Sequence, residues 1–283
     1  MAALLQAAHP GLRTELVEVD TAGDRDRNTP LHELGGQGIF VKEVQAAVLD
    51  GRADAAVHSA KDLRSIATPG LDIAGVPERG DPRDGLVGST LDDLPTGATV
   101  GTGSVRRRAQ LAAIRPDLRF AELRGNMHTR LDRAAELGAV VVAVAALDRL
   151  DLADRLAERL DPGVVVPQVG QGALAVECRS DDAVTAALLT RVDHPASRTA
   201  LVAERAWLAE LGSGCDLPVG AHATVEADGT IRVTGLIATL DGRVVLRDHT
   251  AGDDPVAVGR ELAQRQVERG GRRLLQPGAA ATS

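Results

Sequence analysis

Apolar and polar residues follow two different periodicities along this chain. Short, mostly apolar runs such as 139–147 are typical of buried strands. Other segments, such as 40–50, place apolar residues three and four positions apart, which favours a helix. In the middle of the chain the order strand, loop, helix repeats. This order predicts a parallel sheet with helices on both faces.

These periodicities assign an element to most of the chain. We expect helices at 2–9, 40–50, 105–115, 128–137, 150–160, 182–190, 196–211 and 255–269. We expect strands at 14–19, 53–59, 71–79, 98–104 (strand, then loop), 118–123 and 139–147, and two short strands within 164–179. Segment 81–88 is expected to cross between strands, 20–38 to form a polar loop, and the tail from 277 to be disordered.

The last third of the chain has a different pattern. Segments 221–227, 230–240 and 243–250 alternate with period two and are separated by turns that contain Asp-Gly. They predict an antiparallel meander, which the helix at 255–269 would close into a small α+β domain.

Composition narrows the class of protein. The chain has 283 residues, of which 25% are charged and 44% hydrophobic, as is ordinary for a globular protein. Aromatic residues make up only 1%, so the core must be built from Ala, Val and Leu. A net charge of −8 and a pI near 5.4 argue against nucleic-acid binding. No apolar run approaches the roughly 20 residues of a membrane helix, and the N-terminus lacks a basic signal region, so we expect a cytoplasmic protein that binds no membrane.

One segment carries the opposite charge to the rest of the chain. From Gly101 to Arg133 there are eight arginines and only three acids. Two loops rich in Gly, Ser, Thr and Asn lead into predicted helices here, and helix N-termini favour anions. Arginine adds planar donors that suit carboxylate or phosphate. The segment predicts a site for a small ligand with several negative groups, although Arg106 and Arg107 could also form a solvated helix face.

Other candidate residues come from position and type. His58 and Ser59 end the predicted strand 53–59, and Lys61 and Asp62 follow it, at the strand end where α/β proteins place ligands. Asp62 alone would favour a turn cap, and we give His58 and His128 no proton-transfer role. Cys215 lies in a polar, glycine-rich loop, which favours a chemical role over burial. Cys178 lies in an alternating segment, which favours core packing. We predict no metal site.

Five motifs occur in the order VHSAKD, GTGSVRRRAQL, LRGNMHTRL, PQVGQGALAVECR and GSGCDLPVG. Together they resemble the porphobilinogen deaminase (hydroxymethylbilane synthase) family over nearly the whole chain. The resemblance implies an α/β fold of two domains like those of periplasmic binding proteins, with a cleft between them, and a small α+β domain that carries Cys215. We place the first domain at 1–78 with 168–192, the second at 79–167 and the third at 193–283.

The resemblance also implies an activity. The family joins four porphobilinogen molecules head to tail, releases ammonia at each step and forms hydroxymethylbilane in tetrapyrrole biosynthesis. It implies a dipyrromethane cofactor, held by a thioether to the cysteine that matches Cys215. We expect the protein to be a monomer. Each pyrrole carries an acetate and a propionate, so the growing chain is a polyanion that suits the arginine-rich loops.

Residue roles are implied motif by motif. Asp62 matches the catalytic carboxylate, which would exchange protons with pyrrole nitrogens and stabilise cationic intermediates. Besides Cys215, cofactor contacts are implied for Lys61, Ser59, Ser104, Arg106, Arg107, Thr102 and Thr129. Substrate contacts are implied for Arg124, Arg130, Arg149 and Phe40.

The sequence departs from the family pattern at three places, and these keep alternatives open. The family's first strand, resembling RIGTRxSxLA, would precede Met1, so the start codon is placed too late or the copy is truncated. Glu33 and Gln37 stand where the family's mobile loop carries lysines, and Arg64 replaces the proline of KDxP. The alternatives are a catalytically impaired paralogue and a non-enzymatic anion-binding module of the periplasmic-binding-protein type.

Overall fold

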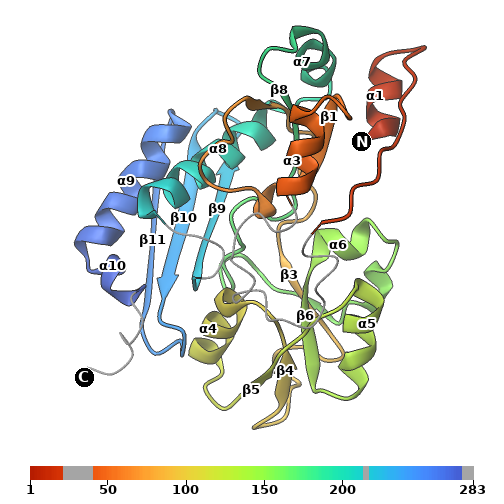
Figure 1. Ribbon diagram of the computed structural model, residues 1–283. Helices are drawn as coiled ribbons and strands as arrows, with labels where there is room; N and C mark the ends of the chain where they lie inside the picture. The colour runs from red at the N-terminus through yellow and green to blue at the C-terminus, as the bar shows by residue number, and fades with distance from the viewer. Residues whose placement is uncertain (22–40, 213–216, 276–283) are drawn as a thin grey trace.

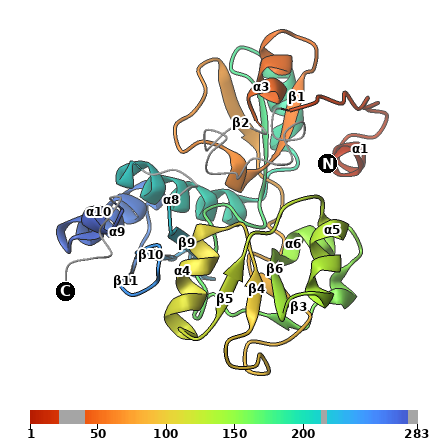
Figure 2. The same ribbon diagram turned by 60° about the horizontal axis from the view of Figure 1, so that its bottom comes forward.

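The computed structural model describes residues 1–21, 41–212 and 217–275. These residues form three lobes, and each lobe contains one sheet (Figure 1, Figure 2). Helix α1 (Ala2–Ala8) lies beside the first lobe, whereas the last described helices lie on the third lobe (Figure 1). In the described parts of the chain, no helix combines the length and the apolar character that crossing a membrane requires.

The first lobe is built around a three-stranded sheet in the order β1-β8-β2. Its strands are β1 (Ala55–Ser59), β2 (Leu71–Gly75) and β8 (Leu174–Arg179), and β8 runs antiparallel to both neighbours. Helices α3 (Lys42–Leu49) and α7 (Ala183–Thr190) belong to this lobe. Strand β8 returns here after the chain has built the second lobe, which supports a first domain made of two segments. The domain boundaries themselves stay a prediction.

The second lobe holds a five-stranded sheet in the order β5-β4-β6-β3-β7. Its strands are β3 (Asp84–Val87), β4 (Thr99–Gly101), β5 (Arg119–Ala121), β6 (Ala139–Ala143) and β7 (Glu158–Arg159). Its helices are α4 (Val105–Ile114), α5 (Met127–Asp132) and α6 (Val144–Asp148), with the 3-10 turns η2 (Arg133–Ala135) and η3 (Ala153–Arg155). Strand β4 is parallel to β5 and β6, but β3 is antiparallel to β6 and β7. The predicted all-parallel sheet is therefore confirmed only for β5-β4-β6.

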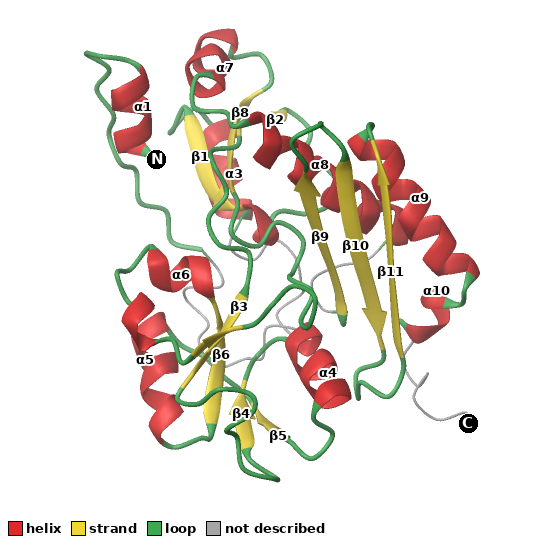
Figure 3. Cartoon of the chain, turned by 180° about the vertical axis from the view of Figure 1, so that it is seen from behind, coloured by secondary structure: helices red, strands yellow, loops and turns green. Residues whose placement is uncertain are grey.

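The third lobe confirms the predicted meander and closing helix. Strands β9 (Val219–Val225), β10 (Ile231–Ala238) and β11 (Val245–Gly252) pair antiparallel in sequence order (Figure 3). Helices α8 (Pro195–Leu211), α9 (Pro255–Glu268) and α10 (Gly271–Leu274) complete the lobe. Trp207 of α8 is fully buried, and its indole N–H donates to Gln266 Oε1 of α9 at 2.7 Å. A Cβ on Gly235 would lie 2.6 Å from the indole nitrogen, so β10 needs a glycine where it meets this ring.

Several predicted elements are wrong, and each has a physical reason. Segment 14–19 forms no strand, because no ladder pairs it in the described residues, and Leu16 remains 86% exposed. Segment 150–160 forms η3 and β7 and not a helix, since the left-handed Asp151 (φ 56°) stops a helix at its start. Segment 81–88 contains the buried strand β3, and the apolar run 139–147 divides into β6 and α6. Within 164–179 only β8 is a strand.

Candidate active site

Asp62 lies in η1 (Ala60–Asp62), the 3-10 turn that directly follows β1. Ala60 N–H donates to the carbonyl of Ala173 at 3.0 Å, which ties the turn to a second segment of the chain. Gly170, at φ +72°, packs so closely on this turn that a Cβ would lie 2.9 Å from the Ala60 carbonyl carbon. The backbone that carries Lys61 and Asp62 is therefore fixed by its contact with the glycine-rich segment before β8.

The surroundings of Lys61 and Asp62 shift the pKa of both side chains. Burial raises the pKa of the Asp62 carboxyl, and the neighbouring Lys61 and His58 oppose that rise. Burial lowers the pKa of the Lys61 amine, with Asp62 opposing and Arg107 adding to the effect. Within the described residues, no hydrogen bond or ion pair engages the Asp62 carboxyl group. Its oxygens are thus available to a ligand.

The first arginine-rich loop enters α4, and its hydroxyls shape the helix start. Ser104 is the N-cap, and its oxygen accepts from the backbone N–H of Arg107. The buried Thr102 hydroxyl oxygen accepts from Ser104 N–H at 3.1 Å. The side chains of Arg106 and Arg107 are buried and turn into the protein, which excludes the solvated helix face.

Both arginines bind Asp84 on β3, a residue that the sequence analysis missed. Arg106 makes two contacts with the Asp84 carboxylate, at 2.6 and 3.2 Å, and Arg107 Nε donates to it at 2.8 Å. Gln171 Nε2 adds a fourth contact at 2.9 Å. Despite complete burial, these cations hold the pKa of Asp84 far below its usual range. The signal that the sequence offered for Asp84 was an acidic residue at the start of the otherwise apolar segment DGLV.

Replacing Asp84 with Asn is expected to destabilise the protein by about 3–5 kcal/mol, because two buried guanidinium groups lose their counter-charge. The pKa of Asp84 is lowered on folding, so its contribution is present above the ordinary carboxyl pKa of about 4 and is lost as pH falls further. Urea denaturation at several pH values measures the effect. The surface pair Arg115–Asp117 offers a control, since Asp117→Asn should change stability little. Equal losses in the two variants would contradict the prediction.

The second arginine-rich loop enters α5 and is capped by Asn126. The Asn126 side-chain oxygen accepts from the backbone N–H and the hydroxyl of Thr129, each at 3.0 Å. Arg130 Nε donates to the carbonyl of Gly125 at 2.9 Å. Burial lowers the pKa of Arg130, and the charges of Arg107 and Arg124 lower it further. Like charges from both loops therefore gather in one region, which is favourable only when an anion lies among them.

The two chain crossings between the first and second lobes lie next to this region. Gly80 N–H and Arg149 Nη2 both donate to the carbonyl of Gly172, at 3.1 and 2.7 Å. Arg79, in the first crossing, forms two contacts with the fully buried Glu204 of α8, at 2.6 and 3.2 Å. Glu204 was also missed by the sequence analysis. It connects the crossings to the third lobe.

The structure therefore brings most predicted site residues to one region. Lys61 is near enough to Arg107, Asp84 and Arg106 for their charges to shift its pKa, which joins the first lobe to the second. Phe40, Cys215, Glu33 and Gln37 lie outside the described residues. Cys178 is buried in the first-lobe core, as predicted. No group of three or more His, Cys, Asp or Glu suited to a metal occurs among the residues that the structure describes.

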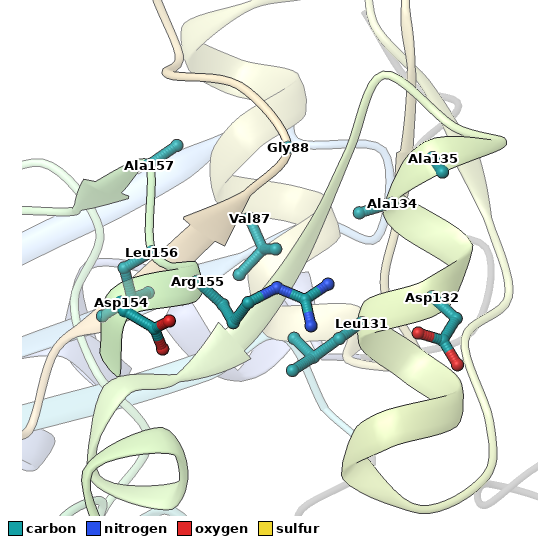
Figure 4. Close-up of a pocket in the computed structure, with 10 residues that line it drawn as sticks. All are labelled: Val87, Gly88, Leu131, Asp132, Ala134, Ala135, Asp154, Arg155, Leu156 and Ala157. Carbon is teal, nitrogen blue, oxygen red and sulfur yellow. The ribbon is translucent and has the colours of Figure 1, made fainter. Parts of the chain in front are cut away.

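A separate pocket lies on the second lobe (Figure 4). It has a volume of about 660 Å³ and is lined by Val87, Gly88, Leu131, Asp132, Ala134, Ala135, Asp154, Arg155, Leu156 and Ala157. None of the predicted site residues lines it, so it is distinct from the region around Asp62.

Comparison with known proteins gives matches over nearly the whole chain. The family model "Porphobilinogen deaminase, dipyromethane cofactor binding domain" matches residues 1–187, and "Porphobilinogen deaminase, C-terminal domain" matches 199–267. The porphobilinogen deaminase of Roseiflexus sp. (strain RS-1) is 46% identical over 277 residues, covering 96% of this chain and 91% of that protein. That of Roseiflexus castenholzii is 47% identical over 278 residues, with the same coverage. That of Acidothermus cellulolyticus is 46% identical over 287 residues, covering 98% of this chain and 86% of that protein.

Proposed function

This chain belongs to the porphobilinogen deaminase family, and from that premise we propose how its residues carry out the reaction. The protein is a transferase of haem biosynthesis that condenses four porphobilinogen molecules to hydroxymethylbilane with release of ammonia, on a covalent dipyrromethane. The assignment of roles depends chiefly on one observation, the convergence of the Asp62 turn with the arginine-rich loops.

The described residues fit a dipyrromethane. The group carries acetates and propionates, and the region offers five cationic side chains against two carboxylates: Lys61, Arg106, Arg107, Arg124 and Arg130 against Asp62 and Asp84. Asp84 neutralises only one of its two arginines, so this buried cluster keeps one net positive charge toward an anion. When bound, the group supplies the pyrrole end on which the product is built. Cys215 is the residue that would hold it, through a thioether.

Asp62 is proposed as the catalytic carboxylate. Its oxygens are not engaged by the described residues, so they can accept the N–H of a pyrrole ring and exchange its proton. As positive charge develops on the substrate when ammonia leaves, the fixed carboxylate stabilises it without rearrangement. The raised pKa of Asp62 suits proton exchange nearer neutral pH than an ordinary aspartate allows. Ser59, at the end of β1, and Lys61 are proposed to bind the cofactor beside it.

The arginine-rich loops are proposed to bind the carboxylates of the cofactor and substrate. Arg106 and Arg107 serve the cofactor, together with the helix starts that Thr102, Ser104 and Thr129 shape by their hydroxyl bonds. Arg124, Arg130 and Arg149 bind substrate, and Phe40 stacks on a pyrrole ring. Arg149 is bonded to the chain crossing at Gly172, so it is placed to respond to movement between the lobes.

Substitution of Arg130 tests this assignment. Arg130→Gln is expected to raise KM for porphobilinogen about 10- to 100-fold, because a charge-assisted bond to a substrate carboxylate is lost. Arg119 on β5 is exposed and makes no ion pair among the described residues, so Arg119→Gln is the matched control. Steady-state kinetics of porphobilinogen consumption give both values. A KM that changes equally in the two variants would remove Arg130 from the site.

The chain is also proposed to act as a cytoplasmic monomer that binds no nucleic acid. Its acidic balance, with a net charge of −8, supports the last point. Cys178 is a buried free thiol, which is in keeping with a reducing compartment. The family membership does not favour the impaired paralogue or the non-enzymatic anion-binding module.

A further inference from the structure

The two hairpin turns of the third lobe have nearly the same local structure but different neighbours. Each contains Asp-Gly, with φ values of 86° at Gly229 and 72° at Gly242, and each glycine N–H donates to the carbonyl three residues earlier at 3.0 Å. A Cβ on Gly229, between β9 and β10, would have no neighbour within 4 Å among the described residues. The turn of Gly242, between β10 and β11, lies instead on α4 of the second lobe (Figure 1, Figure 3). The hairpin geometry alone does not require that contact.

The contact between the β10–β11 turn and α4 is made by the two backbones. A Cβ on Gly242 would clash with the carbonyl oxygen of Ala109 and would lie 2.9 Å from the backbone nitrogen of Ala113. Position 242 therefore needs a glycine both for its positive φ and for this close approach. Beside the turn, Leu236 and Ala238 of β10 form a buried apolar cluster with Ala109. The end of the third-lobe sheet thus fixes the middle of α4.

A second contact of the third lobe reaches the side chain of Arg106 itself. A Cβ on Gly220 of β9 would lie 2.9 Å from the carbonyl oxygen of Val166 and 3.1 Å from Cδ of Arg106. Arg106 Nη1 donates to the same Val166 carbonyl at 2.8 Å. Gln110 of α4 donates to this carbonyl at 3.0 Å and accepts from the Val166 N–H at 2.7 Å. The Val166 peptide is therefore enclosed between α4 and β9, so the third lobe restrains both the helix and its buried arginine.

We propose that the β10–β11 turn of the third lobe positions α4, and that Gly242 is a positioning residue for Arg106 and Arg107. This inference rests on the cofactor role proposed for these two arginines. Both lie in the first turn of α4 and bind Asp84 of their own lobe, so a displaced helix would move both guanidinium groups. A guanidinium binds a carboxylate best in one planar geometry, which such a displacement would disturb. Cys215 lies between α8 and β9 in the sequence, so the lobe that would hold the cofactor also aligns its arginines.

Gly242→Ala and Gly229→Ala form a matched pair of variants. Each places a methyl group at positive φ in an Asp-Gly turn, so the backbone strain is similar, but only Gly242→Ala also pushes on α4. Intact-protein mass should show the dipyrromethane increment on a fraction of folded Gly242→Ala about tenfold lower than in Gly229→Ala, because one charge-assisted bond is worth at least that factor. Thermal unfolding identifies the folded protein. A merely structural role would lower the unfolding midpoint but leave the folded molecules fully loaded.

Asp241→Ala perturbs the same turn without adding atoms toward α4. The Thr239 hydroxyl donates to Asp241 Oδ1 at 2.6 Å, and the backbone N–H of Arg243 donates to it at 3.1 Å, so the carboxylate shapes the turn. Its removal should lower the loaded fraction in the same direction by a smaller factor. Asp228→Ala is the control, because Asp228 accepts from the Thr230 N–H at 2.9 Å in the open turn, and it should keep the full increment.

The loaded fractions decide the proposal. Folded Gly242→Ala or Asp241→Ala protein that carries the increment as fully as its control would overturn it. Arg106→Gln, in which Arg107 still neutralises Asp84, tests the proposed function separately. Full loading of Arg106→Gln would remove the cofactor role of that arginine. A loss of loading in Arg106→Gln, together with full loading of both turn variants, would leave the cofactor role intact and remove only the positioning by the turn.

Discussion

Replacing Asp62 with Asn should lower kcat for porphobilinogen consumption by about 10²–10⁴-fold while leaving the fold intact. Asparagine has the same shape, but it cannot exchange a proton or carry the negative charge that faces the developing cation. Burial already raises the pKa of Asp62, so the folded protein tolerates a neutral group at this position, and thermal unfolding should show no loss of stability. Single-turnover and steady-state rates at neutral pH measure the effect.

The pH profile of the unsubstituted enzyme tests the same proposed role of Asp62 in proton exchange. The pKa of Asp62 is raised, so protonation removes the carboxylate as pH falls through a value above the ordinary aspartate range, and kcat/KM should decline there. Asp72→Asn, on the exposed face of β2, is the control and should retain full activity. Retention of more than about a tenth of the activity by Asp62→Asn would assign the proton exchange to another group.

The parts of the site that could be predicted from the sequence are those whose residues lie close together along the chain. Asp62 lies in the short turn that directly follows its strand, and the loops before α4 and α5 show their caps, Ser104 and Asn126, beside the arginines. Local rules of helix capping connect such residues to an anion site without knowledge of the fold. Residue chemistry alone indicated only a small ligand with several negative groups. The resemblance carried by the five motifs added which ligand this is.

The missed residues share a different property, since their partners lie far away in the sequence. Asp84 binds arginines on α4, and Glu204 binds Arg79 across 125 positions. An acid in an apolar segment gives no indication of which cation will neutralise it. The same limit explains the strand errors. Segment 14–19 has the right alternation, but a strand also needs a neighbour, and periodicity cannot show that β3 runs antiparallel to β6.

The structure also suggests why these buried acids lie where they do. Asp84 fixes two arginines of the second lobe, and Glu204 accepts from Arg79, Gly170 N–H and Ala223 N–H, which joins the chain crossings to the third lobe. Gly170 also packs on the turn of Asp62. The turn that carries Asp62, the crossings and the third lobe are thus connected by direct contacts. A movement of the third lobe would therefore reach the turn that carries Asp62, the proposed catalytic carboxylate.

Replacing Cys215 with Ala should remove the covalent cofactor completely. Intact-protein mass should show an increment of one dipyrromethane in the unsubstituted chain and none in the variant, because a thioether needs the sulfur atom. Activity should be lost with the increment, since no primer remains to receive the first porphobilinogen. The mass measurement is independent of turnover, so it tests attachment even where the enzyme is slow.

Cys178→Ala is the matched control for this experiment. Cys178 is 1% exposed on β8, and burial raises the pKa of its thiol, so it is a poor nucleophile and should not carry the cofactor. Its variant should keep the increment, with at most a modest loss of stability from the small cavity. An increment that persists in Cys215→Ala and disappears in Cys178→Ala would move the attachment into the first-lobe sheet, where the buried thiol could be reached only by opening the packing of β8 against α7. The surrounding core makes that outcome physically unfavourable. The masses of the two variants together show whether Cys215 or Cys178 carries the cofactor.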